Sequence, residues 1–240
     1  MAKLHDEWRV LPHGPLTQVE PGLLTVVGTI PKPLGNFPRR MTVVAVSGKK
    51  TAIFSPIALR EEGMAEIERL GAPSYLIVPN GFHRLDAKPW KERYPNIAVV
   101  CPPGAQRRVE KAVAVDATTD VLRDKAVKLV LIQGTGESEF ALLIGRQGAI
   151  TLVVNDVIAN VRHPPGLGAY VMARVFGFGV KHPQIPREVK WLFLKDKTAL
   201  AAQLREWATM SGLQRVIPSH GDIIDRPARI LGGLAESLSG

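Results

Sequence analysis

The sequence predicts an α/β protein in which two β-sheets pack face to face, with helices on the outside. Two observations predict this fold. The apolar runs follow the order hairpins, helix, strand, helix and strand, and then hairpins, helix, strand and helix again. Several of these runs also lack polar alternation, which is typical of strands that are covered on both faces. Each half of the chain is therefore expected to form one sheet and its helices.

The composition is that of a folded, basic protein. The chain has 240 residues, of which 45% are hydrophobic and 22% are charged. This length fits one large domain or two small ones, and we interpret residues 1–240 as one domain. The single cysteine, Cys101, excludes an internal disulfide and fits a reducing compartment. It lies in an apolar run, which indicates a buried strand thiol rather than a nucleophile. No secretory signal is visible, so a cytoplasmic location is expected.

The net charge of +9 permits an anionic partner but does not select one. The basic residues are scattered in pairs such as Arg39-Arg40 and Arg107-Arg108, without an aromatic platform beside them. We therefore do not expect nucleic acid to be the main partner. A nucleic-acid-processing role stays open only if the basic residues line one face that leads to the site. No run approaches the roughly 18 apolar residues of a membrane span, so no membrane partner is expected. A homodimer is left open.

The first half begins with antiparallel strands and continues with alternating helices and strands. Strands are expected at residues 23–27, 41–46, 51–54, 75–78 and 97–101. Residues 31–38 contain three prolines and are expected to form a loop. Residues 58–70 predict an amphipathic helix, because apolar side chains recur there at a spacing of three. A short helix is expected at residues 105–112.

The second half repeats this order around a segment without clear periodicity. Strands are expected at residues 128–132, 140–144, 149–154 and 215–218. Residues 197–210 predict an amphipathic helix, and a last helix is expected at residues 226–238. Residues 160–188 are rich in glycine and proline. We interpret them as a loop or a helical insertion beside the functional site.

Polar side chains follow the strand at 75–78, and strand ends are where α/β layers place their ligand sites. This cluster contains Asn80, His83, Arg84 and Asp86. A spacing of three would put His83 and Asp86 on one side of a helical turn. An imidazole and a carboxylate suit zinc, iron or manganese. The alternative is a surface histidine with an aspartate that caps a helix.

Two further strand ends carry candidate metal ligands. Asp156 follows the strand at 149–154, where a carboxylate is costly unless it is paired or metal-bound. A strand-end turn residue is the alternative. His220 lies between the last strand and Gly221, and Asp222 is placed to orient its ring. A histidine that only makes structural hydrogen bonds is the alternative there.

These pieces, in this order, resemble the metallo-β-lactamase superfamily over nearly the whole chain. The family's bridging aspartate corresponds to Asp156, and its last histidine corresponds to His220 in the turn Pro218-Ser-His-Gly221. Its first motif, His-x-His-x-Asp-His, would fall at Asn80 to Asp86. The resemblance implies a four-layer αββα sandwich of two mixed β-sheets.

The sequence departs from the family pattern at several metal positions. Asn80 and Phe82 replace two histidines of the first motif, and Thr135 or a neighbour replaces the central histidine. The resemblance therefore implies at most one divalent ion, zinc, iron or manganese. The implied ligands are His83, Asp86, Asp156 and His220. Asn80, Thr135 and Asp222 are expected around them.

With one ion bound, the resemblance implies a hydrolase that cleaves an ester, lactone, amide or phosphoester of a small molecule. Asp156 and Arg84 are then the expected catalytic residues, and Arg84 would hold an anionic group of the substrate. The alternative is a catalytically inactive relative that binds a ligand or a partner. In that case Arg84 would occupy the cation position and pair with Asp156.

Overall fold

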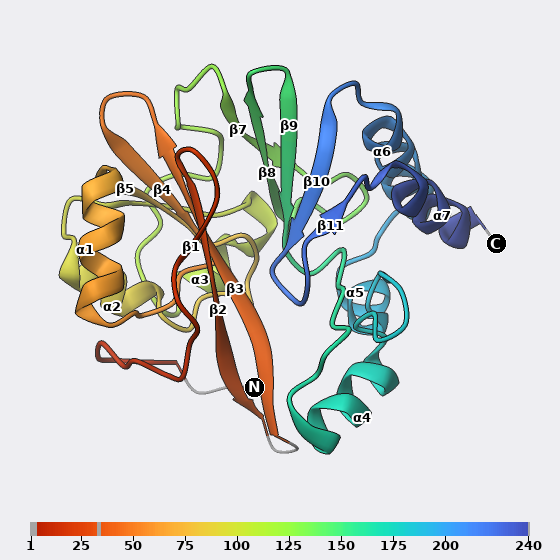
Figure 1. The fold of residues 1–240 in the computed structure, drawn as a ribbon, viewed down its shortest axis with the longest axis horizontal. Helices are drawn as coiled ribbons and strands as arrows, with labels where there is room; N and C mark the ends of the chain where they lie inside the picture. The colour runs from red at the N-terminus through yellow and green to blue at the C-terminus, as the bar shows by residue number, and fades with distance from the viewer. Residues whose placement is uncertain (1–3, 33–34, 240) are drawn as a thin grey trace.

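The computed structural model describes residues 4–32 and 35–239, and its strands form two sheets that face each other (Figure 1). In spatial order the first sheet contains β1 (Thr17–Glu20), β2 (Leu23–Lys32), β3 (Gly35–Val46), β4 (Lys50–Phe54), β5 (Ala72–Ile77) and β6 (Ala98–Val100). The second contains β11 (Ile224–Asp225), β10 (Leu213–Pro218), β9 (Ala149–Val154), β8 (Phe140–Arg146) and β7 (Val127–Leu131). Each half of the chain forms one sheet, as predicted.

Helices cover the outer face of each sheet, which confirms the four-layer αββα arrangement. The first sheet is covered by α1 (Glu61–Leu70), α2 (Ala87–Arg93) and α3 (Gln106–Val109), which follows the short 3₁₀ helix η1 (Pro103–Ala105). The second is covered by α6 (Lys197–Thr209) and α7 (Ala228–Ser239). In Figure 1, α1 and α2 lie on the left, and α6 and α7 lie on the right.

The strands are apolar without alternation because both of their faces are buried. In β4, Phe54 contributes to the core between the two sheets, whereas its neighbour Ile53 packs under the helices of the first sheet. In β9, Val153 and Val154 divide in the same way. Successive side chains of a strand point to opposite faces, so a strand inside a four-layer sandwich needs apolar residues at every position.

The hairpin of β2 and β3 differs from the prediction of a loop at residues 31–38. The two strands pair as far as Pro31 with Asn36 and Lys32 with Gly35; residues 33–34 of the predicted loop lie outside the described part. β1 reaches only Thr25, and β4 begins to pair at Thr42. The far end of the β2–β3 hairpin therefore consists of two strands. A proline is tolerated there when its backbone nitrogen, which has no N–H to donate, faces away from the partner strand.

Residues 160–188 contain α4 (Gly166–Phe176) and, after an irregular stretch, the start of α5 (Arg187–Leu192). Both helices lie at the lower right of Figure 1, beside the ends of the strands rather than over a sheet. α4 ends at Gly177, which has the left-handed backbone conformation (φ 73°) that glycine adopts at no steric cost. Among the described residues, the structure contains no helix with the length and apolar character needed to cross a membrane.

Candidate metal centre

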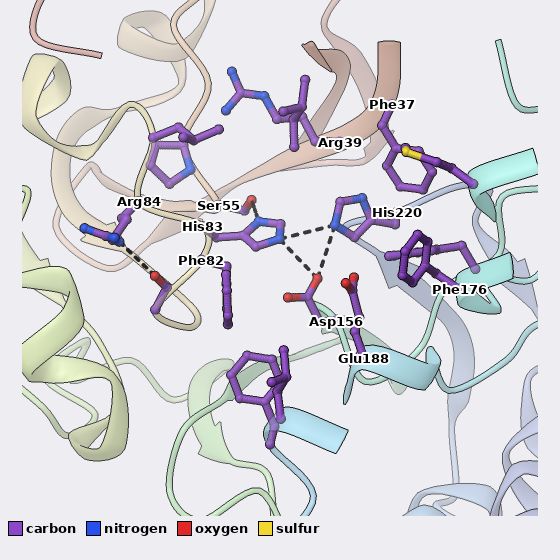
Figure 2. Close-up of a pocket in the computed structure, with 18 of the residues that line it drawn as sticks. Phe37, Arg39, Ser55, Phe82, His83, Arg84, Asp156, Phe176, Glu188 and His220 are labelled. Carbon is purple, nitrogen blue, oxygen red and sulfur yellow. Dashed lines mark hydrogen bonds and ion pairs between the residues drawn. The ribbon is translucent and has the colours of Figure 1, made fainter. Parts of the chain in front are cut away.

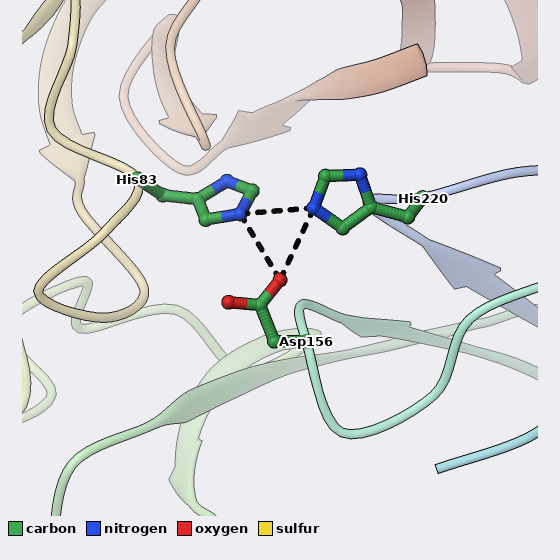
Figure 3. A group of neighbouring side chains, drawn as sticks. All are labelled: His83, Asp156 and His220. Atoms are coloured by element: carbon green, nitrogen blue, oxygen red, sulfur yellow. Dashed lines mark hydrogen bonds and ion pairs between the residues drawn. The ribbon is translucent and has the colours of Figure 1, made fainter. Parts of the chain in front are cut away.

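Side chains that follow three strands, one from the first sheet and two from the second, meet at one point. His83 follows β5, Asp156 follows β9 and His220 follows β10, and β9 and β10 pair in parallel. The ends of these strands point to the same edge of the sandwich, so the side chains beyond them converge (Figure 3). In the part of the chain that the structure describes, these three residues form the group whose ligand atoms lie within 4.8 Å of one another.

The spacing of the three ligand atoms fits one metal ion. Asp156 Oδ1 lies 3.1 Å from His83 Nε2 and 3.1 Å from His220 Nε2, and the two Nε2 atoms are 3.3 Å apart. A tetrahedral zinc ion with ligand bonds of about 2.0–2.1 Å holds its ligand atoms about 3.3–3.4 Å apart. The three side chains therefore need little rearrangement to bind such an ion.

Hydrogen bonds on the far side of each ring direct the Nε2 atoms toward the centre. His220 Nδ1 lies 2.7 Å from the carbonyl oxygen of Pro38, and His83 Nδ1 lies 2.7 Å from Ser55 Oγ. A carbonyl oxygen only accepts, so Nδ1 of His220 carries the proton, and in the neutral ring Nε2 keeps its lone pair. Burial lowers the pKa of His83, which favours its neutral form. Neutral imidazoles held in this way are the usual metal ligands.

Asp156 is an anion at this point. Burial alone would raise its pKa, but the positive charge that His83 and His220 carry when protonated, together with their hydrogen bonds, holds the pKa well below its usual value. A carboxylate between two imidazole nitrogens is a typical ligand set for a first-row divalent cation. The donor set therefore fits the ion that the sequence resemblance implies.

Asn80 organises the loop that carries His83. Its Nδ2 donates to Asp156 Oδ2 at 2.7 Å and to Glu139 Oε2 at 3.3 Å. Its Oδ1 accepts hydrogen bonds from the backbone N–H groups of Phe82 and His83. Asn80 therefore touches Asp156 directly and fixes the backbone of the residue that supplies the first imidazole.

Glu139, which no sequence pattern singles out, is fully buried beside the centre. It accepts from the backbone N–H of Val157 at 3.0 Å. Burial, and then the negative charge of Asp156, raise its pKa. A protonated Glu139 avoids a second buried anion next to Asp156. No local pattern marks it, because it differs from other acidic residues only in what the fold packs around it.

Asp86 lies outside the group, which differs from the sequence prediction. Its buried carboxylate pairs with Arg39 at 2.6 Å and with His5 at 2.8 Å. Residues 83–86 do not form a helical turn; α2 begins only after Asp86. The spacing of three therefore does not bring Asp86 beside His83.

Three other predicted residues have different neighbours from those expected. Thr135 is buried and donates to the carbonyl of Ile132. The expected acceptor at the His220 ring was Asp222, but the Pro38 carbonyl takes that position. Arg84 donates from Nε to the carbonyl of Gly81 at 2.9 Å. In the view of Figure 2, His83 lies between Arg84 and Asp156.

A pocket of about 410 Å³ opens beside the three ligand residues (Figure 2). Its polar lining includes Arg39, Ser55, Arg84 and Glu188. Its walls are mainly apolar: Leu4, Ile30, Phe37, Phe82, Met172, Phe176, Phe178, Leu192 and Phe193. Mostly apolar walls with a few convergent polar groups are typical of small-molecule sites. Helices α4 and α5 supply part of this wall.

Solved structures with a similar fold include several metallo-β-lactamases. The metallo-β-lactamase DIM-1 exposed to ceftazidime superposes with a TM-score of 0.63 at 13% identity, covering 95% of this chain and 99% of that one. A metallo-β-lactamase from Hirschia baltica gives a TM-score of 0.61 at 12% identity, covering 93% and 97%. The protein has the metallo-β-lactamase fold.

The mono-zinc form of the metallo-β-lactamase FIM-1 from Pseudomonas aeruginosa gives a TM-score of 0.58 at 14% identity, covering 96% of this chain and 97% of that one. No protein-family model and no curated protein matches the sequence. At these identities the comparison establishes the metallo-β-lactamase fold and not the activity. The function of this protein therefore has to be inferred from its own residues.

Proposed function

We propose that this protein is a hydrolase that depends on one divalent metal ion. His83, Asp156 and His220 would hold the ion, and zinc suits the spacing of these ligand atoms best. The observation that carries the proposal is the convergence of two imidazole nitrogens and one carboxylate oxygen, each 3.1–3.3 Å from the others, at the wall of a pocket. Three protein ligands leave a coordination position for water or substrate, as catalytic zinc sites do.

When bound, the ion would supply a Lewis acid and a source of hydroxide near neutral pH. The chain's own residues complete the site. Ser55 and Pro38 keep both imidazoles oriented, and Asn80 holds Asp156 from the other side. The apolar walls exclude water and so strengthen the electrostatic interactions inside the pocket.

The substrate we propose is a small ester, lactone, amide or phosphoester with a large apolar part. The apolar part matches the aromatic and aliphatic walls of the pocket. Arg84 also lines the pocket, and its Nη1 is a buried donor without a partner among the described residues. A free guanidinium donor favours an anionic or oxyanion group on the substrate.

The alternative of an inactive binding protein would have Arg84 paired with Asp156. Among the described residues, the carboxylate of Asp156 instead contacts the imidazoles of His83 and His220. Within the described part of the chain, no lysine or arginine side chain therefore pairs with Asp156 at the position that an ion would take. This supports the metal-dependent proposal over the inactive one.

The test is metal content followed by activity. Protein stripped with chelator and dialysed against Zn²⁺, Mn²⁺ or Fe²⁺ should retain about one equivalent of metal, measured by plasma mass spectrometry. The loaded protein is then assayed on nitrophenyl esters of increasing chain length, a lactone panel and a nitrophenyl phosphodiester. His220→Ala should remove both metal and turnover. Retention below about a tenth of an equivalent for all three ions would rule out the proposal.

A further inference from the structure

The outer face of α4 and α5 exposes a group of large apolar side chains. Of the nine such side chains that are exposed among the described residues, seven lie between residues 167 and 192. Leu167 is 79% exposed and Trp191 is 73% exposed. Leu167, Val171 and Val175 follow at spacing four on α4, so they share one face of the helix. We call these three residues with Trp191 the α4–α5 face.

The inner side of α4 is already used by the protein. Ala169 and Ala173 are buried, and Met172 and Phe176 line the pocket beside the metal centre. The exposed positions therefore do not belong to a helix that has lost its packing; they are a second apolar surface on a helix whose first surface is covered. Large apolar side chains that are exposed and concentrated in one short segment of this kind mark an interaction site.

Basic side chains accompany the α4–α5 face. A groove of about 710 Å³ runs between the segment from α4 to α5 and helix α7, and no aspartate or glutamate is among the residues that line it. Its charged and titratable lining consists of Arg174, Lys181, His182, Arg187, Lys190 and Arg229. Arg187 and Trp191 are four residues apart on α5, so a basic and an apolar side chain share one helical face.

No described acidic side chain forms an ion pair with these basic residues; the ion pairs among the described residues all lie elsewhere. Glu188, the acidic residue of α5, lines the pocket on the other side of the helix. The surface therefore combines apolar side chains with uncompensated positive charge, and it fits a partner that is both apolar and anionic.

We propose that the α4–α5 face docks onto an anionic phospholipid bilayer. Amphipathic helices with Trp and Leu on one face and Lys and Arg beside it lie in the plane of the membrane interface. Basic residues near an anionic leaflet each strengthen the binding. A helix that binds at the membrane surface needs no membrane-spanning segment. The sequence expectation of no membrane partner rested only on the absence of such a segment, so it does not bear on this mode of binding.

A second copy of the chain fits this surface less well. A two-fold symmetric interface brings the same patch of both protomers together. Such an interface would bring together the Arg174, Arg187 and Lys190 side chains of both protomers, and the lining of the groove offers no carboxylate to pair with them. An anionic bilayer supplies both the apolar layer and the missing negative charge.

The test is flotation with lipid vesicles of two compositions. Full-length protein should float with phosphatidylcholine vesicles that contain about one third phosphatidylserine, but not with phosphatidylcholine alone. Raising the ionic strength from about 0.1 M to about 1 M should weaken binding, because the Debye length falls from about 10 Å to about 3 Å. Trp191 fluorescence should shift to the blue on binding.

Two double variants separate the apolar from the basic part, and a third is the control. Leu167→Asn with Trp191→Ala should lower vesicle affinity about tenfold or more, and Lys190→Glu with Arg229→Glu should lower it at least about 30-fold. Lys125→Glu with Lys128→Glu makes the same change in net charge at two exposed residues, one just before β7 and one in it, and should leave binding within about twofold. Each variant must keep the wild-type circular dichroism and melting temperature.

Several outcomes would overturn the proposal. Wild-type protein that fails to float with anionic vesicles is one, and equal losses in the control and in the two test variants are another. Sedimentation velocity that detects a dimer, dissociated by Leu167→Asn with Trp191→Ala, would assign the face to a second copy. A DNA duplex that competes fully with the vesicles at equal charge would assign the groove to nucleic acid. None of these outcomes depends on metal binding or turnover, so the proposal can fail while the proposed function stands.

Discussion

The Nδ1 atom of His220 lies 2.7 Å from the carbonyl oxygen of Pro38, although 182 residues separate them in the chain. Pro38 belongs to β3 of the first sheet, and His220 follows β10 of the second. The bond orients the last ligand of the candidate metal centre from the opposite sheet. It also explains why the long β2–β3 ribbon matters for function: without the extension of β3, the ring would lack its acceptor.

Ser55 should tune the metal affinity without being a ligand. Ser55→Ala removes the Oγ that lies 2.7 Å from His83 Nδ1. Loss of such a partner typically lowers metal affinity about 10–100-fold. Competition with a fluorescent zinc chelator measures the change. Ser138→Ala, which removes an exposed hydroxyl bonded to Gly136, is the matched control and should not alter the affinity. An unchanged affinity in Ser55→Ala would show that the hydroxyl does not orient His83.

Asp86 should contribute to stability and not to metal binding. Arg39→Met leaves the Asp86 carboxylate buried with only His5 as its partner, and breaking a buried pair costs about 3–5 kcal/mol. Urea unfolding measures this loss. Asp86→Asn should keep one equivalent of metal, in contrast to His220→Ala. Loss of metal in Asp86→Asn, with an unchanged fold, would restore Asp86 as a ligand.

Gly221 should be intolerant of a side chain. Its φ of +101° is strained for any other residue, and an added Cβ would collide with the backbone of Asn160. Gly221→Ala should therefore destabilise the fold by about 1–3 kcal/mol from backbone strain, with the collision adding to this, and it should weaken metal binding through its neighbour His220. Gly232→Ala, at a helical glycine with open space around it, is the control and should be neutral or stabilising.

Cys101 should be inert in the folded protein. Burial raises the pKa of its thiol from 9.0 to about 12. Ellman's reagent at pH 8 should therefore react with the unfolded chain and not with the native one. Above pH 9 the thiol ionises in the unfolded state before it does in the folded state, so its contribution to stability is lost as the pH rises toward 12. Cys101→Ala should lack this part of the alkaline decline; an identical decline would argue against it.

The layers could be predicted because burial of an element produces a local pattern of apolar residues in the sequence. A strand such as β9 must be apolar throughout, and an outer helix such as α6 must be apolar on one side. The β2–β3 ribbon was mispredicted because the three prolines of residues 31–38 suggested a loop, and only the short reach of β1 and β4 makes the ribbon possible.

The site could be predicted only where a strand end marks it. His83, Asp156 and His220 each follow an apolar strand, and they converge because the strand ends do. Asp86 has the same local setting as His83, but Arg39, from a distant strand, pairs with it. Glu139 and Ser55 carry no local signal at all. Their roles depend on contacts between segments that lie far apart in the chain, and a single sequence does not encode these visibly.

The three candidate ligands are divided between the two halves of the chain. His83 comes from the amino-terminal half, and Asp156 and His220 come from the carboxy-terminal half. A fragment of either half would hold at most two of the three donors. A bound ion would therefore link the two halves. Each tenfold increase of free metal above its dissociation constant would raise the free energy of unfolding of the whole molecule by about 1.4 kcal/mol.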